Sequence, residues 1–144
     1  MITTGAYVVR WVASRIGDHG NFGVATQAIG WERNGRLVAG VVYADYNGPN
    51  VWCHIASEGS HWLTRRYLWA IFDYPFNQMN VKRITCPVGE GNSKSRRFVE
   101  KLGFIAETTL REAHPTGDLL LYSMSKESCR WIGSESLPRF AKAA

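Results

Sequence analysis

The sequence contains no apolar run that approaches the roughly 18 residues needed to cross a bilayer, so no membrane-spanning helix is expected. Its first residues, MITTGAYVVRWVASR, lack the basic start and the small-residue cleavage site of a secretory signal. We therefore expect a cytoplasmic protein without a membrane partner. The 144 residues fit one folded domain, which we place at 1–132, with a C-terminal tail at 133–144.

Cysteine is scarce as well. Cys53, Cys86 and Cys129 are far apart in the sequence and form no CxxC pair. This pattern argues against a disulfide framework and against a zinc site, and it is typical of buried thiols that pack as small hydrophobic groups. The four histidines are also scattered, without an HxxxH pair, so no metal site is expected.

Acidic residues are fewer than basic ones. The chain carries 12 Asp and Glu against 17 Lys and Arg, which leaves a formal net charge of +5. This excess favours an anionic ligand, such as a phosphorylated cofactor or nucleic acid. A solvated basic surface would produce the same count, so charge alone does not choose between these interpretations.

Hydrophobic spacing and turn residues predict the order of the secondary-structure elements. Helices are predicted at 6–16, 62–79 and about 93–102. Strands are predicted at 26–33, 36–46, 51–57, 81–88, 104–113 and 118–127. Asn34-Gly35 suits a type I′ turn between the first two strands, because both central residues of that turn need positive φ. Pro75 should kink or end the second helix, because it removes one backbone donor.

Strand 51–57, helix 62–79 and strand 81–88 form one βαβ unit, so these two strands should be parallel with a right-handed connection. The hairpins before and after this unit should extend the sheet in antiparallel fashion. The predicted fold class is therefore α/β (α+β). It is a mixed, mostly antiparallel sheet with one central parallel crossover and helices on both faces.

Three stretches of the chain carry a resemblance to a known family: AIGWERNGRLVAGVVY, LWAIFDYPFNQMNVKRITCPV and NSKSRRFVEKLGF. They resemble segments of the GCN5-related N-acetyltransferases. AIGWERNGRLVAGVVY resembles their central hairpin, and LWAIFDYPFNQMNVKRITCPV resembles their third helix and fifth strand. NSKSRRFVEKLGF is similar to their signature N-x-x-S/A-x-x-x-x-x-K-x-G-F. The order of predicted elements agrees with that family from about residue 24 to residue 130. The serine at the fourth signature position and the closing LLLYSMSKESCRWI look most like the branch that acetylates ribosomal-protein N-termini.

The resemblance implies acetyl-CoA as the cofactor, with its pantetheine arm held where the fourth and fifth strands splay apart. It also implies that the pyrophosphate lies on the N-terminus of the next helix, where free N–H groups and the helix dipole favour an anion. The candidate cofactor-binding residues are therefore Ile55, Ala56, Ser57, Trp62, Leu63, Thr64, Arg65, Arg66, Asn92, Arg96 and Arg97.

The chain departs from the family pattern at two places. The glycines usual in the phosphate loop fall here at Trp62 and Thr64, which makes close approach of the backbone to phosphate harder. Many members also carry a tyrosine seven residues after the motif asparagine, which protonates the leaving thiolate, and that position is Val99 here. Ser95 or an ordered water could take this acid role. Asn92 could cap its helix, or bond the cofactor if Ser93 provides the cap.

Transfer of an acetyl group to an amine requires a base, a polarised thioester carbonyl and a proton for the thiolate. A backbone N–H near Ala56 or Ser57 could polarise the carbonyl. Glu58 follows strand 51–57 and His54 lies on it, so either could accept the amine proton, directly or through a water. Each residue also has a purely structural interpretation. Glu58 would then be a surface carboxylate, and His54 a hydrogen-bonded, half-buried residue.

The predicted function is that of an acyltransferase that moves an acetyl group from acetyl-CoA to a primary amine. The acceptor could be a protein N-terminus or other peptide, a small molecule, or an amine on a modified nucleobase. The alternative is a non-catalytic binding module on the same fold, for which nucleic acid is one candidate partner. The sequence is also compatible with a homodimer through the C-terminal strand and tail. Acceptor loops vary within a fold, so the acceptor is not named by the sequence.

Overall fold

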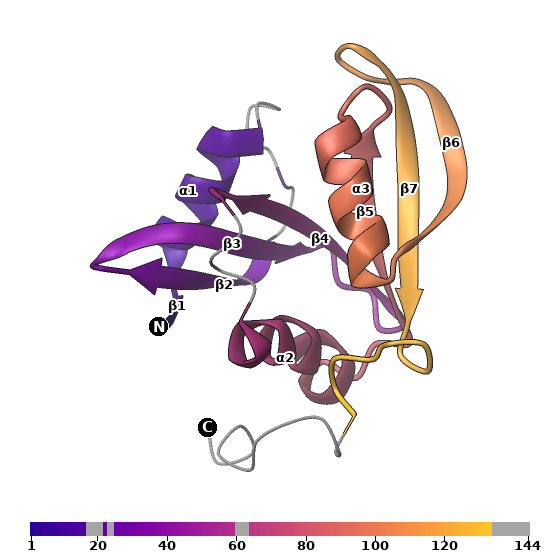
Figure 1. Cartoon of the computed structure of the whole chain (residues 1–144). Helices are drawn as coiled ribbons and strands as arrows, with labels where there is room; N and C mark the ends of the chain where they lie inside the picture. Colours follow the sequence, from indigo (N-terminus) through magenta and orange to yellow (C-terminus); the bar gives the residue numbers. More distant parts are fainter. Residues whose placement is uncertain (17–21, 23–24, 60–63, 134–144) are drawn as a thin grey trace.

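The computed structural model of the chain describes residues 1–16, 22, 25–59 and 64–133 (Figure 1). In this part, seven strands form one sheet: β1 (Ile2–Thr4), β2 (Ala25–Arg33), β3 (Arg36–Ala44), β4 (Asn50–Ser57), β5 (Arg83–Gly89), β6 (Ile105–His114) and β7 (Gly117–Ser125). Three α-helices, α1 (Ala6–Ile16), α2 (Arg65–Asp73) and α3 (Ser93–Leu102), accompany the sheet, and a π-helix, η1 (Tyr74–Gln78), follows α2. None of these helices combines the length and apolarity that crossing a bilayer requires.

The sheet order is β1-β2-β3-β4-β5-β7-β6, and β4 with β5 is the parallel pair among antiparallel neighbours. This confirms the predicted mixed, mostly antiparallel sheet with one parallel crossover. The β4–β5 ladder is short and ends at the pair Trp52↔Thr85. Beyond that pair β4 continues to Ser57 and β5 to Gly89, and the two strands diverge as Figure 1 shows.

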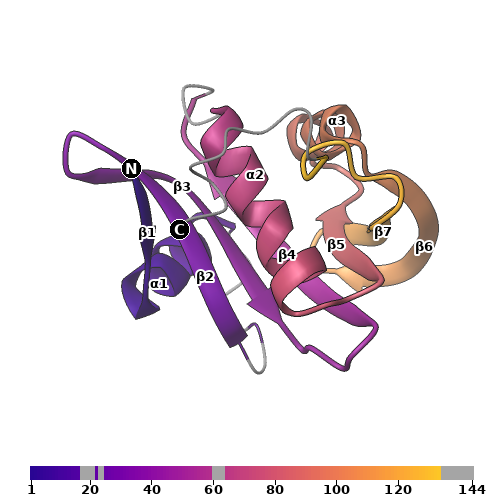
Figure 2. The same ribbon diagram turned by 90° about the horizontal axis from the view of Figure 1, so that it is seen from below.

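Helices cover both faces of the sheet, with α1 on one side and α2 with α3 on the other (Figure 2). Val8 and Val12 of α1 are fully buried against β3, where Gly40 lets the helix approach closely. A Cβ at Gly40 would lie 2.7 Å from Val12 Cγ2, so a larger residue would push the helix away. This packing forms the smaller of two hydrophobic clusters.

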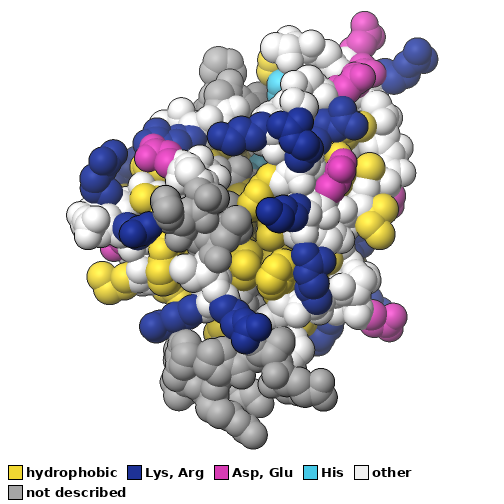
Figure 3. Space-filling model, viewed as in Figure 1, with side chains coloured by type: hydrophobic (Ala, Val, Ile, Leu, Met, Phe, Trp, Pro, Cys, Tyr) yellow, Lys and Arg dark blue, Asp and Glu magenta, His cyan; other side chains and the backbone are white. Residues whose placement is uncertain are grey.

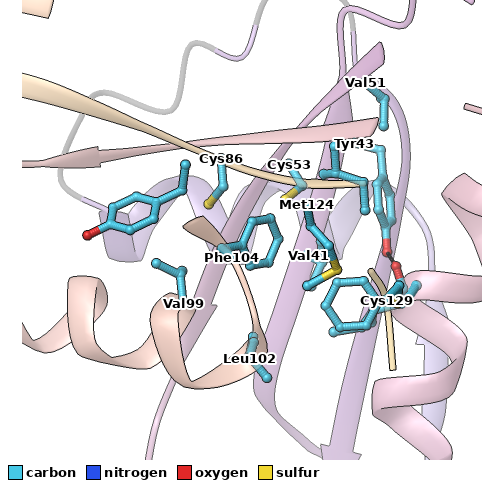
Figure 4. Packing of buried hydrophobic residues seen from close by; sticks show 14 of the residues in the cluster. Val41, Tyr43, Val51, Cys53, Cys86, Val99, Leu102, Phe104, Met124 and Cys129 are labelled. Atoms are coloured by element: carbon cyan, nitrogen blue, oxygen red, sulfur yellow. Dashed lines mark hydrogen bonds between the residues drawn. The ribbon is translucent and has the colours of Figure 1, made fainter. Parts of the chain in front are cut away.

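The larger cluster lies under α2 and α3. Figure 4 shows Val41, Cys53, Val99 and Phe104 among its members, drawn from strands and helices that are distant in sequence. Within the cluster the hydroxyl of Tyr67 donates to the carbonyl oxygen of Ile29 at 2.8 Å, which satisfies a polar group in the core. Burial raises the pKa of this hydroxyl far above its ordinary value.

The cysteine prediction is confirmed, because all three cysteines are unoxidised and buried. Cys53 of β4 lies beside Cys86 of β5 just past the last ladder pair, and a hydrogen bond between the two thiols raises the pKa of Cys53 together with burial. Cys129 lies in the segment after β7, and burial raises its pKa as well. High thiol pKa values disfavour the reactive thiolate form.

The observed elements differ from the predicted ones at α2 and at β1. The single helix expected at 62–79 is α2 followed by the π-helix, since Pro75 lacks the backbone N–H needed for regular bonding; residues 62–63 lie outside the described part. The N–H of Met79 bonds the carbonyl of Tyr74 at 2.9 Å, so the chain continues as a wider helix rather than stopping. β1 was not predicted, because three residues are too few to show a period.

Candidate functional site

The divergence of β4 from β5 opens a cleft of about 1260 Å³. Residues from α1, β4, β5, α3 and the β6–β7 hairpin line it. Since α1 and α3 lie on opposite faces of the sheet, the cleft reaches both faces at the splay. A ligand held between the strands could therefore meet a second ligand that approaches from the other face.

The β4 wall of the cleft carries three predicted cofactor-binding residues, Ile55, Ala56 and Ser57, all of which line it. On the β3 side these residues are paired with Val41, Gly40 and Ala39. On the other side the ladder to β5 has already ended. Among the described strands, the β4 backbone groups that point toward β5 have no ladder partner beyond this point, and a ligand with amide groups could pair with them.

His54 also lines the cleft, from the middle of β4. It is half-buried, and its ring centroid lies 4.6 Å from that of Phe22, which lines the same cleft. This contact orients the imidazole against an aromatic wall. His54 is therefore the predicted base candidate whose side chain faces the space where β4 and β5 separate.

Glu58, the other base candidate, lies outside the cleft lining. Its carboxylate forms an ion pair with Arg15 of α1, which does line the cleft. Glu58 also borders a small hollow of about 230 Å³ with Arg33 and Arg36, at the β2–β3 turn. The structure thus places Glu58 at the rim, where it holds a cleft-lining arginine in position.

The opposite wall is the cleft side of α3, which we define as Lys94, Arg97 and Lys101. These three residues occur at i, i+3 and i+7, so they share one helix face, and all three line the cleft. In Figure 3, dark-blue Lys and Arg side chains follow α3 along a hydrophobic hollow. Arg97 was predicted, whereas Lys94 and Lys101 were missed, although their helical spacing could have revealed them.

Arg96 does not share this wall. It belongs to the strand side of α3, which we define as Arg96 and Glu100 with Tyr122 of β7. Arg96 Nε donates to the Tyr122 hydroxyl at 3.4 Å, and Arg96 Nη1 donates to the carbonyl oxygen of Glu90 at 3.2 Å. The Tyr122 hydroxyl donates in turn to the Glu100 carboxylate at 2.5 Å. Arg96 was predicted to contact the cofactor; here its guanidinium bonds the protein, and it is not among the residues that line the cleft.

The first turn of α3 settles which residue caps it. Asn92 is the N-cap, and its Oδ1 accepts from the backbone N–H of Ser95 at 3.1 Å. Of the two predicted alternatives, Asn92 and not Ser93 therefore caps the helix. Asn92 still lines the cleft, where its side-chain NH₂ group can face a ligand. Ser95 is half-buried and lines the cleft too. Val99 is only 2% exposed and stands where a tyrosine is usual in the family that the motif resembles.

The N-terminus of α2 was predicted to meet the pyrophosphate. Thr64 caps this helix, and its hydroxyl accepts from the N–H of Tyr67 at 3.2 Å. Thr64, Arg65 and Arg66 are not among the residues that line the cleft. Trp62 and Leu63 lie outside the described residues. In the described ranges no group of three or more His, Cys, Asp and Glu side chains could hold a metal ion.

Comparisons with solved structures identify proteins of the same architecture. Spermidine N-acetyltransferase from Vibrio cholerae, in complex with CoA and spermine, matches with a TM-score of 0.68 and 14% identity, over 92% of this chain and 98% of that one. Ribosomal-protein-S5-alanine acetyltransferase from Vibrio fischeri matches with a TM-score of 0.58 and 18% identity, over 75% and 64%. An acetyltransferase of the GNAT family from Bacillus anthracis matches with a TM-score of 0.56 and 20% identity, over 70% and 66%.

No protein-family model matches the sequence, and no curated protein matches it. The likeness to known proteins therefore rests on the arrangement of helices and strands. The identities of 14–20% are low, so these matches speak for the fold alone. The chain has the fold of the GCN5-related N-acetyltransferases.

Proposed function

We propose that the protein is an acetyl-CoA-dependent N-acetyltransferase that acts on a primary amine. The observation that carries this proposal is the cleft between β4 and β5. Residues 55–57 lie beyond the end of the β4–β5 ladder and line the same cleft as the basic cleft side of α3. Such a cleft combines amide-pairing groups with positive charge, which suits a ligand that has both amides and phosphates. Coenzyme A has this composition.

The residues present fit the cofactor in two ways. The β4 backbone would pair with the pantetheine amides, in the manner of an added strand. Lys94, Arg97 and Lys101 would form charge-assisted hydrogen bonds with phosphate oxygens. The side-chain NH₂ of Asn92 supplies one more donor. A second phosphate contact remains predicted at the N-terminus of α2 and the residues before it, namely Trp62, Leu63, Thr64, Arg65 and Arg66.

The proposed reaction forms a C–N bond and breaks the C–S bond of the thioester. His54, directly or through a water, would accept the proton that the amine loses. A backbone N–H near Ala56 or Ser57 would bond the carbonyl oxygen as negative charge develops there. Ser95 is the predicted hydroxyl near the leaving sulfur. Glu58 would act through its ion pair with Arg15 rather than on the amine.

The acceptor would enter from the α1 side of the cleft, which Arg15, Phe22 and His54 border. The matched enzymes act on spermidine and on a ribosomal protein alanine, which are both amine acceptors. We propose an amine on a small molecule or a peptide as the acceptor class. A non-catalytic or nucleic-acid-binding role is not favoured, because the cofactor-sized cleft carries candidate reactive groups.

The decisive experiment separates cofactor binding from transfer. Acetyl-CoA should raise the melting temperature, and acetyl-pantetheine, which lacks the nucleotide phosphates, should raise it less. Thiol release should then be measured with a panel of polyamines, amino acids and peptides with free N-termini. The proposal fails if millimolar acetyl-CoA produces neither stabilisation nor thiol release. If the protein instead binds nucleic acid, its affinity for nucleic acid should fall steeply as the salt concentration rises.

A further inference from the structure

His114 lines the cleft without a role in the proposed reaction. It ends β6 and lies beside Gly89, the last residue of β5, which also lines the cleft. The signature asparagine, Asn92, lines the same space. His114 therefore joins the wall formed by β5 and α3, across the cleft from His54 on β4. Several features of the hairpin hold it in this place.

The imidazole ring of His114 packs against the backbone of Gly89. A Cβ added to Gly89 would lie 2.8 Å from Nε2, 2.9 Å from Cε1 and 3.0 Å from Cδ2 of His114. Three ring atoms at such distances show that the ring packs directly onto the glycine. Any larger residue at this position would displace the ring, so Gly89 is needed for the contact rather than for a turn.

The other ring nitrogen, Nδ1, is hydrogen-bonded by Thr116 in the turn that follows β6. The backbone N–H of Thr116 donates to His114 Nδ1 at 3.3 Å, and the Thr116 hydroxyl lies 3.1 Å from the same atom. A backbone N–H can only donate, so Nδ1 must accept. The neutral ring then carries its proton on Nε2, the atom that lies over Gly89 at the cleft.

A bulge in the hairpin aims the side chain. The β6–β7 register shifts between Leu110 and His114, and Glu112 has a φ of 56°, which is uncommon for a residue other than glycine. Asp118 stabilises this backbone by accepting the N–H of Glu112 on its carboxylate at 2.9 Å. Bulges of this kind turn a side chain away from the direction that regular pairing would give it.

We propose that His114 is a further catalytic residue, whose neutral Nε2–H group bonds the coenzyme A sulfur as it becomes a thiolate. This inference rests on the proposed acetyl transfer. It supplies a donor where the usual tyrosine is replaced by Val99, while the Tyr122 hydroxyl is engaged by Glu100. Preorganised donors of this type stabilise charge that develops in the transition state.

The proton balance follows from the tautomer. As the C–N bond forms and the C–S bond breaks, the electron pair of the C–S bond stays on sulfur. The amine proton goes to His54 or to water, and the thiolate later takes a proton from solvent. His114 keeps its own proton throughout, because a neutral imidazole N–H is far too weak an acid to release it.

Activity of two substitutions tests this role. His114→Ala should lower kcat by about 100-fold, the usual cost of removing one preorganised donor, with the KM for acetyl-CoA within about twofold. His114→Gln retains an N–H donor and should recover about tenfold of that loss. Melting temperatures report whether either variant has lost its fold.

Binding measurements test the role without turnover. Long-range ¹H–¹⁵N NMR should assign the Nε2–H tautomer to His114, and its Nε2 signal should shift with CoA but not with desulfo-CoA. Protonation at Nδ1, equal shifts with both ligands, or a kcat of the alanine variant within twofold of wild type would overturn the inference. If the wild-type protein shows no transfer to any amine, the proposed function fails instead, and the NMR comparison still decides whether His114 meets the sulfur.

Discussion

The cleft side and the strand side of α3 use similar residues for different purposes. Arg96 and Arg97 are neighbours in sequence, but successive residues of a helix point about 100° apart. Arg97 joins Lys94 and Lys101 along the cleft, whereas Arg96 bonds Tyr122 and the carbonyl of Glu90. One basic stretch therefore holds a candidate ligand-binding face and a structural face.

The difference lies in which charges the protein itself neutralises. On the strand side, the guanidinium of Arg96 and the carboxylate of Glu100 meet the same tyrosine hydroxyl. In the described ranges the salt bridges are Arg15–Glu58 and Arg83–Glu107, so the three cations of the cleft side have no carboxylate partner there. Positive charge that the fold leaves uncompensated beside a cleft is available to an anionic ligand.

The largest effect should come from removing the packing that both sides depend on. Leu102 is 3% exposed in the core beneath α3, so Leu102→Ala should reduce the free energy of unfolding by about 2–5 kcal/mol, as core leucine truncations do. The neighbouring Lys101→Ala is the matched control and should change stability by no more than about 0.5 kcal/mol. Urea denaturation measures both, and equal effects would show that α3 is not anchored by its apolar face.

Neutralising the cleft side should affect binding rather than stability. The triple substitution Lys94→Gln, Arg97→Gln and Lys101→Gln should weaken acetyl-CoA binding by at least about tenfold, or 1.4 kcal/mol, because three phosphate partners are lost. Isothermal titration calorimetry measures the affinity. Salt should weaken binding to the natural protein more than to the variant, because screening acts on the charges that were removed.

Arg96→Gln is the matched control for that triple substitution. It removes one positive charge from the same helix but from the strand side. The affinity for acetyl-CoA should stay within about threefold of the natural value, since the charge is not beside the cleft. A loss as large as that of the triple variant would mean that total charge, and not its placement, determines binding.

A smaller effect on stability should follow from breaking the strand side. Tyr122→Phe removes the hydroxyl that donates to Glu100 and accepts from Arg96, which should cost about 1 kcal/mol of unfolding free energy. Chemical denaturation measures this cost. Acetyl-CoA affinity should be unchanged, and a clear loss of affinity in this variant would place the Tyr122 hydroxyl in the cleft.

The smallest effect concerns a charge pair away from α3. The hydrogen bond from Arg83 lowers the pKa of the Glu107 carboxyl below its ordinary value. Because the folded pKa is the lower one, this pair stabilises the fold above the unfolded pKa of about 4.3 and stops doing so as pH falls through the folded value. NMR titration should show the Glu107 pKa rise in Arg83→Gln, and an unchanged pKa would exclude the pair in solution.

Local elements agreed closely between sequence and structure. The Asn34-Gly35 turn has positive φ at both residues, 53° and 78°, as a type I′ hairpin requires. The helix predicted at about 93–102 spans Ser93–Leu102 and ends at Gly103 with a φ of 114°. Both features depend on residues within one or two turns of each other, so nearby residue types were sufficient to predict them.

Features that depend on packing could not be placed from the spacing of residues alone. Arg96 was expected at the cofactor, Lys94 and Lys101 were not singled out, and His114 was treated as a scattered histidine. Helical spacing groups residues on a face, but it does not say which face meets the cleft. That choice is made by the docking of α3 on β5 and β7, and for His114 by the bulge before it.

Residue patterns were enough to predict the order of helices and strands, the Asn34-Gly35 turn with positive φ and the signature that points to the fold, and the composition gave the excess of positive charge. These follow from local conformational preferences and from composition. The folded chain was needed to show where β4 leaves β5, which cations of α3 line the cleft, and that the His114 ring lies against Gly89. These depend on contacts between segments far apart in the chain, whose geometry no local pattern contains.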